Sequence, residues 1–116
     1  DIFQARQFIS YNLQQDAPVA TATLTALQPK PQPVGGILTF DAASTGGSAS
    51  HEYQLLVYSY DGDATWREVN GFTTGNTLSW DTTGEVAGSY LLQMRARNVG
   101  TIDIFQARQF ISYDLN

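Results

Sequence analysis

Few residues of this chain have the types and spacing that chemistry would need. His51 is the only histidine, so the sequence holds no second imidazole to complete a metal site. No nucleophile motif accompanies it, and without one a Ser–His–Asp arrangement carries no weight. Cysteine is absent, which excludes disulfides, thiolate nucleophiles and zinc–cysteine sites. We expect His51 to be a solvated residue at a strand end, and the protein not to be an enzyme.

Two acidic and three aromatic residues are the remaining candidates for a ligand site. Asp61 and Asp63 could offer carboxylates to calcium, but the EF-hand spacing is absent and Asp-Gly is the preferred hairpin dipeptide. We therefore expect no metal and no cofactor. Trp66, together with Tyr58 and Tyr60, could instead form a platform that stacks on sugar rings.

Length and composition favour one small β-domain. The chain has 116 residues, of which 42% are apolar and only 15% are charged. Its net charge of −5 argues against nucleic acid, because phosphates require a basic surface. No apolar run approaches the roughly 18 residues of a membrane span, so we expect no membrane insertion. The lack of cysteine fits both the cytosol and a bacterial surface, and composition alone leaves the compartment open.

One segment occurs twice. The sequence DIFQARQFISY occupies residues 1–11 and again 103–113, and 12 of the 14 positions in 1–14 and 103–116 match. The second copy begins 102 residues after the first, which is the size of one small domain. We interpret residues 1–15 as the terminal strand of a preceding repeat and residues 16–116 as the repeat itself.

Alternating apolar residues and regularly spaced turn signals predict seven short strands and almost no helix. The segment from Pro29 to Pro33 carries three prolines and should form an extended connection. The pattern indicates an all-β protein with an antiparallel β-sandwich of about seven strands. The expected strands are 20–27, 36–43, 51–60, 65–69, 76–80, 89–97 and 104–115. The expected core contains Leu38, Phe40, Tyr53, Leu55, Val57, Leu78, Trp80, Tyr90, Leu92, Met94 and Ile111.

The stretch from Gly88 to Asn98 resembles the penultimate strand of immunoglobulin-like and fibronectin type III-like sandwiches. In those domains a tyrosine in the position of Tyr90 forms a corner that pins a crossing loop. The order of several pieces resembles the tandem immunoglobulin-like repeats of large bacterial extracellular proteins. These pieces are Tyr53–Tyr58, Thr65-Trp66, Asn76–Gly84, Gly88–Tyr90, Arg97-Asn98 and Ile111–Tyr113. The resemblance implies an immunoglobulin-like fold, an extracellular or cell-surface location, and a role as spacer, stalk, adhesive module or filament subunit. It transfers no catalytic residue, and the cysteines of antibody-type domains are missing.

Strand parity predicts one sheet face with both apolar and basic side chains. If the tyrosine-bearing strand buries Tyr90, then Leu91 and its basic neighbours face outward. In this fold the third strand lies beside the sixth, and the sixth beside the seventh. The face would pack against a neighbouring copy of the repeat, although an ordinary solvated face is also compatible with the pattern. Its residues are Leu56, Tyr58, Leu91, Arg95, Arg97, Arg108 and Phe110.

The repeated segment predicts a second route to assembly. Residues 1–13 carry nearly the sequence of the seventh strand, so they could pair with or replace 103–115 in another molecule. The side chains of this assembly strand are Ile2, Phe3, Phe8, Ile9 and Tyr11. We expect a structural module of an extracellular fibre, stalk or filament, assembled end to end with copies of itself. The alternative is a carbohydrate- or surface-binding adhesin module, with a glycan as its partner.

Overall fold

Alternating apolar and polar residues form seven strands in the computed structural model, which describes residues 17–47 and 50–116. No helix occurs in those two ranges, and they accordingly hold no helix long and apolar enough to cross a membrane. The strands are β1 (Val19–Ala26), β2 (Ile37–Gly46), β3 (His51–Ser59), β4 (Trp66–Thr73), β5 (Thr77–Asp81), β6 (Gly88–Asn98) and β7 (Ala107–Leu115).

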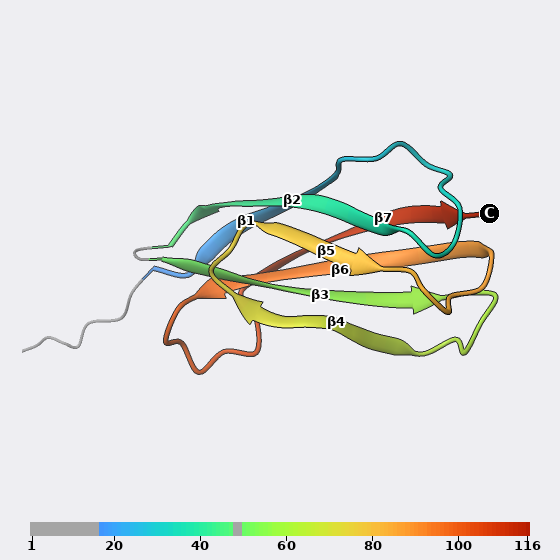
Figure 1. The fold of residues 1–116 in the computed structure, drawn as a ribbon. Coiled ribbons are helices and arrows are strands. Elements are labelled where there is room, and N and C mark those ends of the chain that lie inside the picture. Colours follow the sequence, from blue (N-terminus) through green and yellow to red (C-terminus); the bar gives the residue numbers. More distant parts are fainter. Residues whose placement is uncertain (1–16, 48–49) are drawn as a thin grey trace, which may run out of the picture.

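The strands form two antiparallel sheets that pack face to face (Figure 1). One sheet has the order β1-β2-β5 and the other has the order β4-β3-β6-β7. This confirms the predicted β-sandwich, including the placement of β6 between β3 and β7. The grouping is that of a seven-stranded immunoglobulin-type sandwich in which the fourth strand has joined the sheet of the third.

Three predicted strand boundaries are wrong by three residues or more. The first is the end of β2, which was expected at residue 43 and lies at Gly46. The strand expected at 65–69 does not end there, because β4 continues through Asn70-Gly71 to Thr73. Tyr53 and Leu55 of β3 pair with Thr73 and Asn70, so two steps on one strand oppose three on the other. Such a β-bulge absorbs the extra residue without ending the strand.

The start of the last strand was also placed too early. β7 begins at Ala107, not at Ile104, whose side chain is 71% exposed. Arg97 donates hydrogen bonds to the carbonyls of Asp103 and Ile104, which keeps these carbonyls out of the sheet ladder. The first residues of the second copy of the repeated segment therefore belong to the loop between β6 and β7.

The core lies between the two sheets and contains all but one of the predicted core residues at less than a tenth exposed. Ile111 is the exception, since it is half-buried against the core. Trp80 of β5 packs edge-on against Tyr90 of β6 with ring centroids 5.1 Å apart, which joins the two sheets. The buried set also includes Val19, Leu24, Ala42, Ala96, Tyr113 and Leu115.

A tyrosine corner lies at the start of β6, as the resemblance implied. The buried hydroxyl of Tyr90 donates a hydrogen bond to the carbonyl of Val86, four residues earlier. Gly88, between them, has φ of +143°, and a Cβ there would lie 2.2 Å from a carboxylate oxygen of Asp61. The same oxygen accepts a hydrogen bond from the amide of Ser89 at 2.9 Å. The corner therefore requires glycine at position 88.

Side chains of β7 and the loop before it fasten β1, which within residues 17–47 and 50–116 pairs with a strand on one side only. Gln106 Oε1 accepts hydrogen bonds from the amides of Val19 at 3.1 Å and Asn98 at 3.0 Å. Gln109 Oε1 accepts from the amide of Leu24 at 2.5 Å. Two glutamine side chains thus replace the missing backbone partners of an edge strand and tie the two sheets together.

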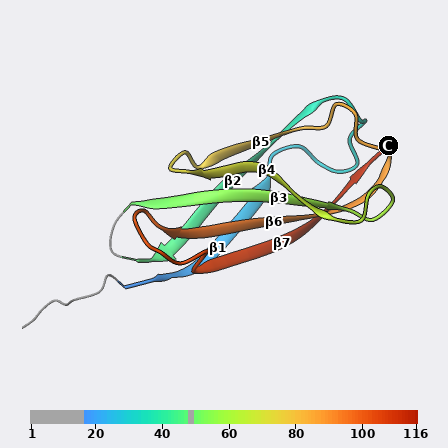
Figure 2. The same cartoon turned by 90° about the horizontal axis from the view of Figure 1, so that it is seen from below.

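The proline-rich connection lies along the end of β7, as an extended segment should. Gln32 donates from its amide to the carbonyl of Asp114 at 3.2 Å and accepts from the amide of Asn116 at 2.9 Å. The described chain starts at one end of the sandwich and leaves at the opposite end, as two perpendicular views show (Figures 1 and 2).

Candidate functional site

The outward surface of the four-stranded sheet brings the predicted packing residues together. Along β3 and β6 the buried residues alternate with half-buried ones that point away from the core, as strand geometry requires. The cross-strand register places Tyr58 beside Leu91, and Arg95 beside Arg108. We call this surface the outer face. Its members are Leu56, Tyr58, Trp66, Leu91, Arg95, Arg97, Arg108 and Phe110.

A row of aromatic rings crosses the outer face. Tyr58 lies 5.1 Å from Tyr60 and 5.4 Å from Trp66, measured between ring centroids. Trp66 in turn lies 6.0 Å from Phe110, although these residues come from the two opposite edge strands β4 and β7. Trp66 and Phe110 remain 40% and 42% exposed. Their side chains therefore extend across the sheet and present a continuous aromatic surface to solvent.

Two arginines face each other beside this row, which is unusual because like charges directly opposite destabilise a sheet. Arg95 and Arg108 are register partners in β6 and β7. Each guanidinium carbon lies 5.0 Å from the ring centroid of Phe105, and Arg108 also lies 5.1 Å from Phe110. Gln93 Oε1 accepts a hydrogen bond from Arg95 at 2.9 Å and a longer one from Arg108 at 3.5 Å.

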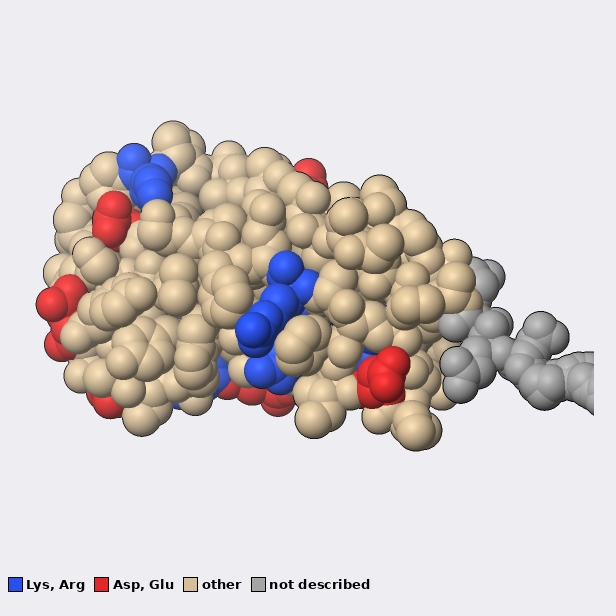
Figure 3. Space-filling model, turned by 180° about the vertical axis from the view of Figure 1, so that it is seen from behind, with Lys and Arg blue, Asp and Glu red and all other residues tan. Residues whose placement is uncertain are grey.

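Neither of these two arginines has a carboxylate within salt-bridge distance among residues 17–47 and 50–116. Arg97 differs, because it pairs with Glu52 at 2.6 Å and lies 3.7 Å above the ring of Phe72. A compact group of basic side chains near the middle of one face is visible in Figure 3, surrounded mostly by uncharged surface. On the outer face, arginine side chains therefore lie over aromatic rings, although the chain as a whole is acidic.

Three residues of this site were missed by sequence reasoning. Phe72, Gln93 and Phe105 have no outward apolar pattern of their own. The two phenylalanines each lie under an arginine, and Gln93 accepts hydrogen bonds from arginines, so their roles depend on the strand register. Gln93 is only 3% exposed although it belongs to the outward row, because neighbouring side chains cover it. The sequence offered one indication that Phe105 has a role, namely that Phe105 belongs to the repeated segment.

His51 begins β3, as expected, but its side chain is half-buried and hydrogen-bonded, so the expectation that it is solvated is wrong. Its Nδ1 lies 2.5 Å from Ser44 Oγ, which lies 2.7 Å from the hydroxyl of Tyr53. Ser44 belongs to β2 and the other two residues to β3, so this chain of hydrogen bonds joins the two sheets.

The two candidate calcium ligands make structural contacts. Asp61 accepts the amide hydrogen bond at the tyrosine corner, and Asp63 forms an ion pair with Arg67 at 3.1 Å. Arg67 also makes two hydrogen bonds to Glu85, and the hydrogen-bonded carboxylate raises the pKa of the arginine. Within the described part of the chain, no three acidic or histidine side chains gather in a way that could hold a metal.

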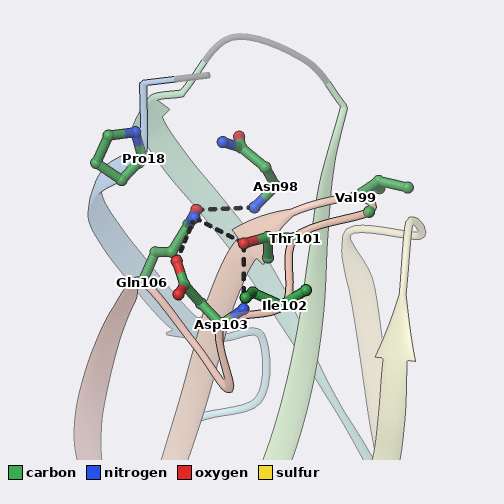
Figure 4. A pocket seen from close by; sticks show the side chains of 8 residues that line it. Pro18, Asn98, Val99, Thr101, Ile102, Asp103 and Gln106 are labelled. Carbon is green, nitrogen blue, oxygen red and sulfur yellow. Dashed lines mark hydrogen bonds between the residues drawn. The ribbon is translucent and has the colours of Figure 1, made fainter. Parts of the chain in front are cut away.

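A pocket lies where the described chain begins. Its volume is about 400 Å³, and it is lined mainly by the loop between β6 and β7. Figure 4 shows Gln106 turned toward Thr101 and Asp103, to which its Nε2 donates at 3.4 Å and 2.9 Å. Asn98 donates to the carbonyl of Ala17 at 2.8 Å. The polar groups here serve mainly to fasten the start of β1 to the loop.

The predicted assembly strand, Ile2, Phe3, Phe8, Ile9 and Tyr11, lies outside the described residues. Its counterparts in the second copy have four different environments. Tyr113 is buried, Ile111 is half-buried, and Phe110 belongs to the outer face, while Ile104 and Phe105 lie in the loop.

No model of a known protein family matches this chain, and no curated protein sequence matches it. The resemblance to bacterial immunoglobulin-like repeats therefore stays a prediction.

Proposed function

We propose that this protein is a structural repeat module that joins copies of itself end to end in an extracellular fibre, stalk or filament. The observation that carries the proposal is the outer face, on which exposed aromatic rings flank two arginines that have no carboxylate partner among the described residues. Tyrosine, tryptophan and arginine are the residues enriched in the centres of protein interfaces. The cell-surface setting and the bacterial source rest on the resemblance of the sequence to bacterial immunoglobulin-like repeats.

The charge of the chain supports a second copy as the partner. A net charge of −5 gives each molecule an acidic surface outside the outer face. Arg95 and Arg108 of one copy would find carboxylates on the next, which would relieve the repulsion between the two guanidinium groups. An association of this kind weakens as salt is added.

The position of the chain ends supports a linear arrangement. The sandwich is entered at one end and left at the other, and the segment 1–14 recurs 102 residues later along the chain. Successive modules of one chain would then follow each other along a line, and identical faces would make the same contact repeatedly. β-Strand donation or exchange is one route by which separate chains would join in the same way.

Removal of apolar side chains from the outer face tests the proposal. The variant carrying Leu56→Ser and Phe110→Ser should sediment as a smaller species than the parent chain at equal concentration. The matched control is Ile37→Ser, because Ile37 is 63% exposed on the other sheet. If the double variant and the control both sediment as the parent chain does, that result would falsify assembly through the outer face.

A carbohydrate-binding adhesin module is the second candidate function, and the aromatic row favours it. Tyr60, Tyr58 and Trp66 form a contiguous, partly exposed series of rings of the kind on which sugars stack. A glycan array should then give a signal that Trp66→Ala removes and Ile37→Ser retains. A blank array with the parent chain would leave the scaffold as the supported function.

A further inference from the structure

The contacts of β7 identify which part of a second copy this sandwich can accept. We propose that residues 1–14 of another molecule can occupy the place of residues 103–116, in the same register, and join the two molecules head to tail. The inference rests on the proposed function and specifies its route. The β7 site is the surface made by β6, the free edge of β1 and the proline-rich connection, which together surround residues 103–116.

Every side chain that holds the second copy in the β7 site recurs in the first copy. Gln106 and Gln109 fasten the amides of β1, the Tyr113 hydroxyl donates to the carbonyl of Gln28 at 2.8 Å, and Lys30 donates to Ser112 Oγ at 2.8 Å. Leu115 is 3% exposed. The residues that stand 102 positions earlier are Gln4, Gln7, Tyr11, Ser10 and Leu13.

The positions that differ do not use their side chains. The two copies differ at Asn12 against Asp114 and at Gln14 against Asn116. Outside the β6–β7 ladder, the hydrogen bonds found at Asp114 and Asn116 within the described residues involve main-chain atoms, which both copies share. The β7 site therefore presents the same partners to either copy and cannot distinguish them.

Chain geometry restricts this exchange to separate molecules. In the shared register Gln4 would lie beside Val19, and Leu13 would lie nine residue steps further along, about 30 Å away. Ala17 is held near Gln106 through Asn98, at the end where the strand begins. The four steps from Leu13 to Ala17 span at most about 14 Å, so a molecule cannot fill its own β7 site with its own first segment.

The resulting junction is the one that a continuous chain of repeats would have. A strand seated in the acceptor would leave at the end where Asn116 now lies and lead through residues 15–18 into the next sandwich. The resident strand competes because it is tethered, and short flexible tethers give effective concentrations of about millimolar. Exchange should therefore increase with protein concentration.

Disulfide trapping in the full chain tests the register, because the natural sequence has no cysteine. Leu91 and Ser112 are cross-strand partners on the outward side, so a bond between Cys residues at positions 91 and 10 reports a seated first segment. The test variant carries Ser10→Cys with Leu91→Cys. The positive control carries Ser112→Cys with Leu91→Cys, and the parity control carries Ile9→Cys with Leu91→Cys.

After mild oxidation at about 1 mM protein, non-reducing electrophoresis and peptide mapping should show bonds from position 10 to position 91 between chains in the test variant. Their yield should rise with concentration, whereas the positive control should close within one chain at every concentration. The proposal is overturned if the test variant gives no more interchain product than the parity control, or if its bond forms within one chain. If strand exchange is overturned in this way, the chain can still assemble through the outer face. In that case assembly is lost in the Leu56→Ser, Phe110→Ser variant.

Discussion

Gln106 offers the sharpest test of how the sandwich is closed. Its side-chain oxygen accepts hydrogen bonds from the amides of Val19 and Asn98, residues that are only 2% and 3% exposed. Gln106→Ala leaves both donors without this acceptor. A buried unsatisfied donor costs about 1–3 kcal/mol, and the low end applies because the open pocket beside Gln106 admits water. We therefore expect a loss of about 2 kcal/mol for the pair.

Urea unfolding of the parent and the variant measures this difference, and a thermal scan should show a decrease in Tm of roughly 10 °C. Amide hydrogen exchange should accelerate first at Val19 and Asn98. The matched control is Gln32→Ala, which removes a single exposed hydrogen bond to the carbonyl of Pro29 and should cost less than about 0.5 kcal/mol. Equal losses in the two variants would refute the role assigned to Gln106.

Three further outcomes follow from local geometry and charge. Gly88→Ala should destabilise the protein by about 1–3 kcal/mol in urea unfolding, whereas Gly36→Ala, which meets no neighbour within 4 Å, should have little effect. Burial raises the pKa of Tyr90 and of Tyr113, so the stability that these two tyrosines contribute should be complete below the usual tyrosine pKa near 10 and decline as pH rises beyond it. The hydrogen bonds from Thr83 lower the pKa of Asp81, and NMR titration of Thr83→Val should show this pKa moving back up toward its usual value of 3.8.

The sequence was a good guide to the strands because burial on one face imposes a period of two. Leu55, Val57, Leu92 and Met94 alternate with outward residues, and this pattern alone separated the core from the outer face. It could not place the end of β4, because Asn-Gly is compatible both with a turn and with a bulge. The exposure of Trp66 also depended on its register partner in β3, which the sequence does not reveal.

The remaining features depend on contacts between distant segments. Phe105 lies between two arginines only because β6 and β7 are paired in one particular register. Gln106 and Gln109 have no hydrophobic pattern, and their attachment to β1 becomes apparent only when the two sheets are packed. Polar residues that replace missing backbone partners are difficult to predict for this reason, because their effect requires the tertiary arrangement.

The two proposed routes of assembly make a joint prediction, because the repeated segment also carries part of the outer face. A donated strand would bring Phe8 to the position of Phe110 and Arg6 to that of Arg108, so exchange would rebuild the outer face on the acceptor.

If both routes operate, Phe110→Ser alone should weaken assembly only partly, since molecules with an exchanged strand regain a phenylalanine. The combined Phe8→Ser, Phe110→Ser variant should lose the remainder, and Phe8→Ser alone should behave nearly as the parent chain. Sedimentation velocity across a concentration series measures all three. If Phe110→Ser alone weakens assembly as much as the double substitution does at every concentration, then the outer face forms only with the resident strand β7 and not with a donated one.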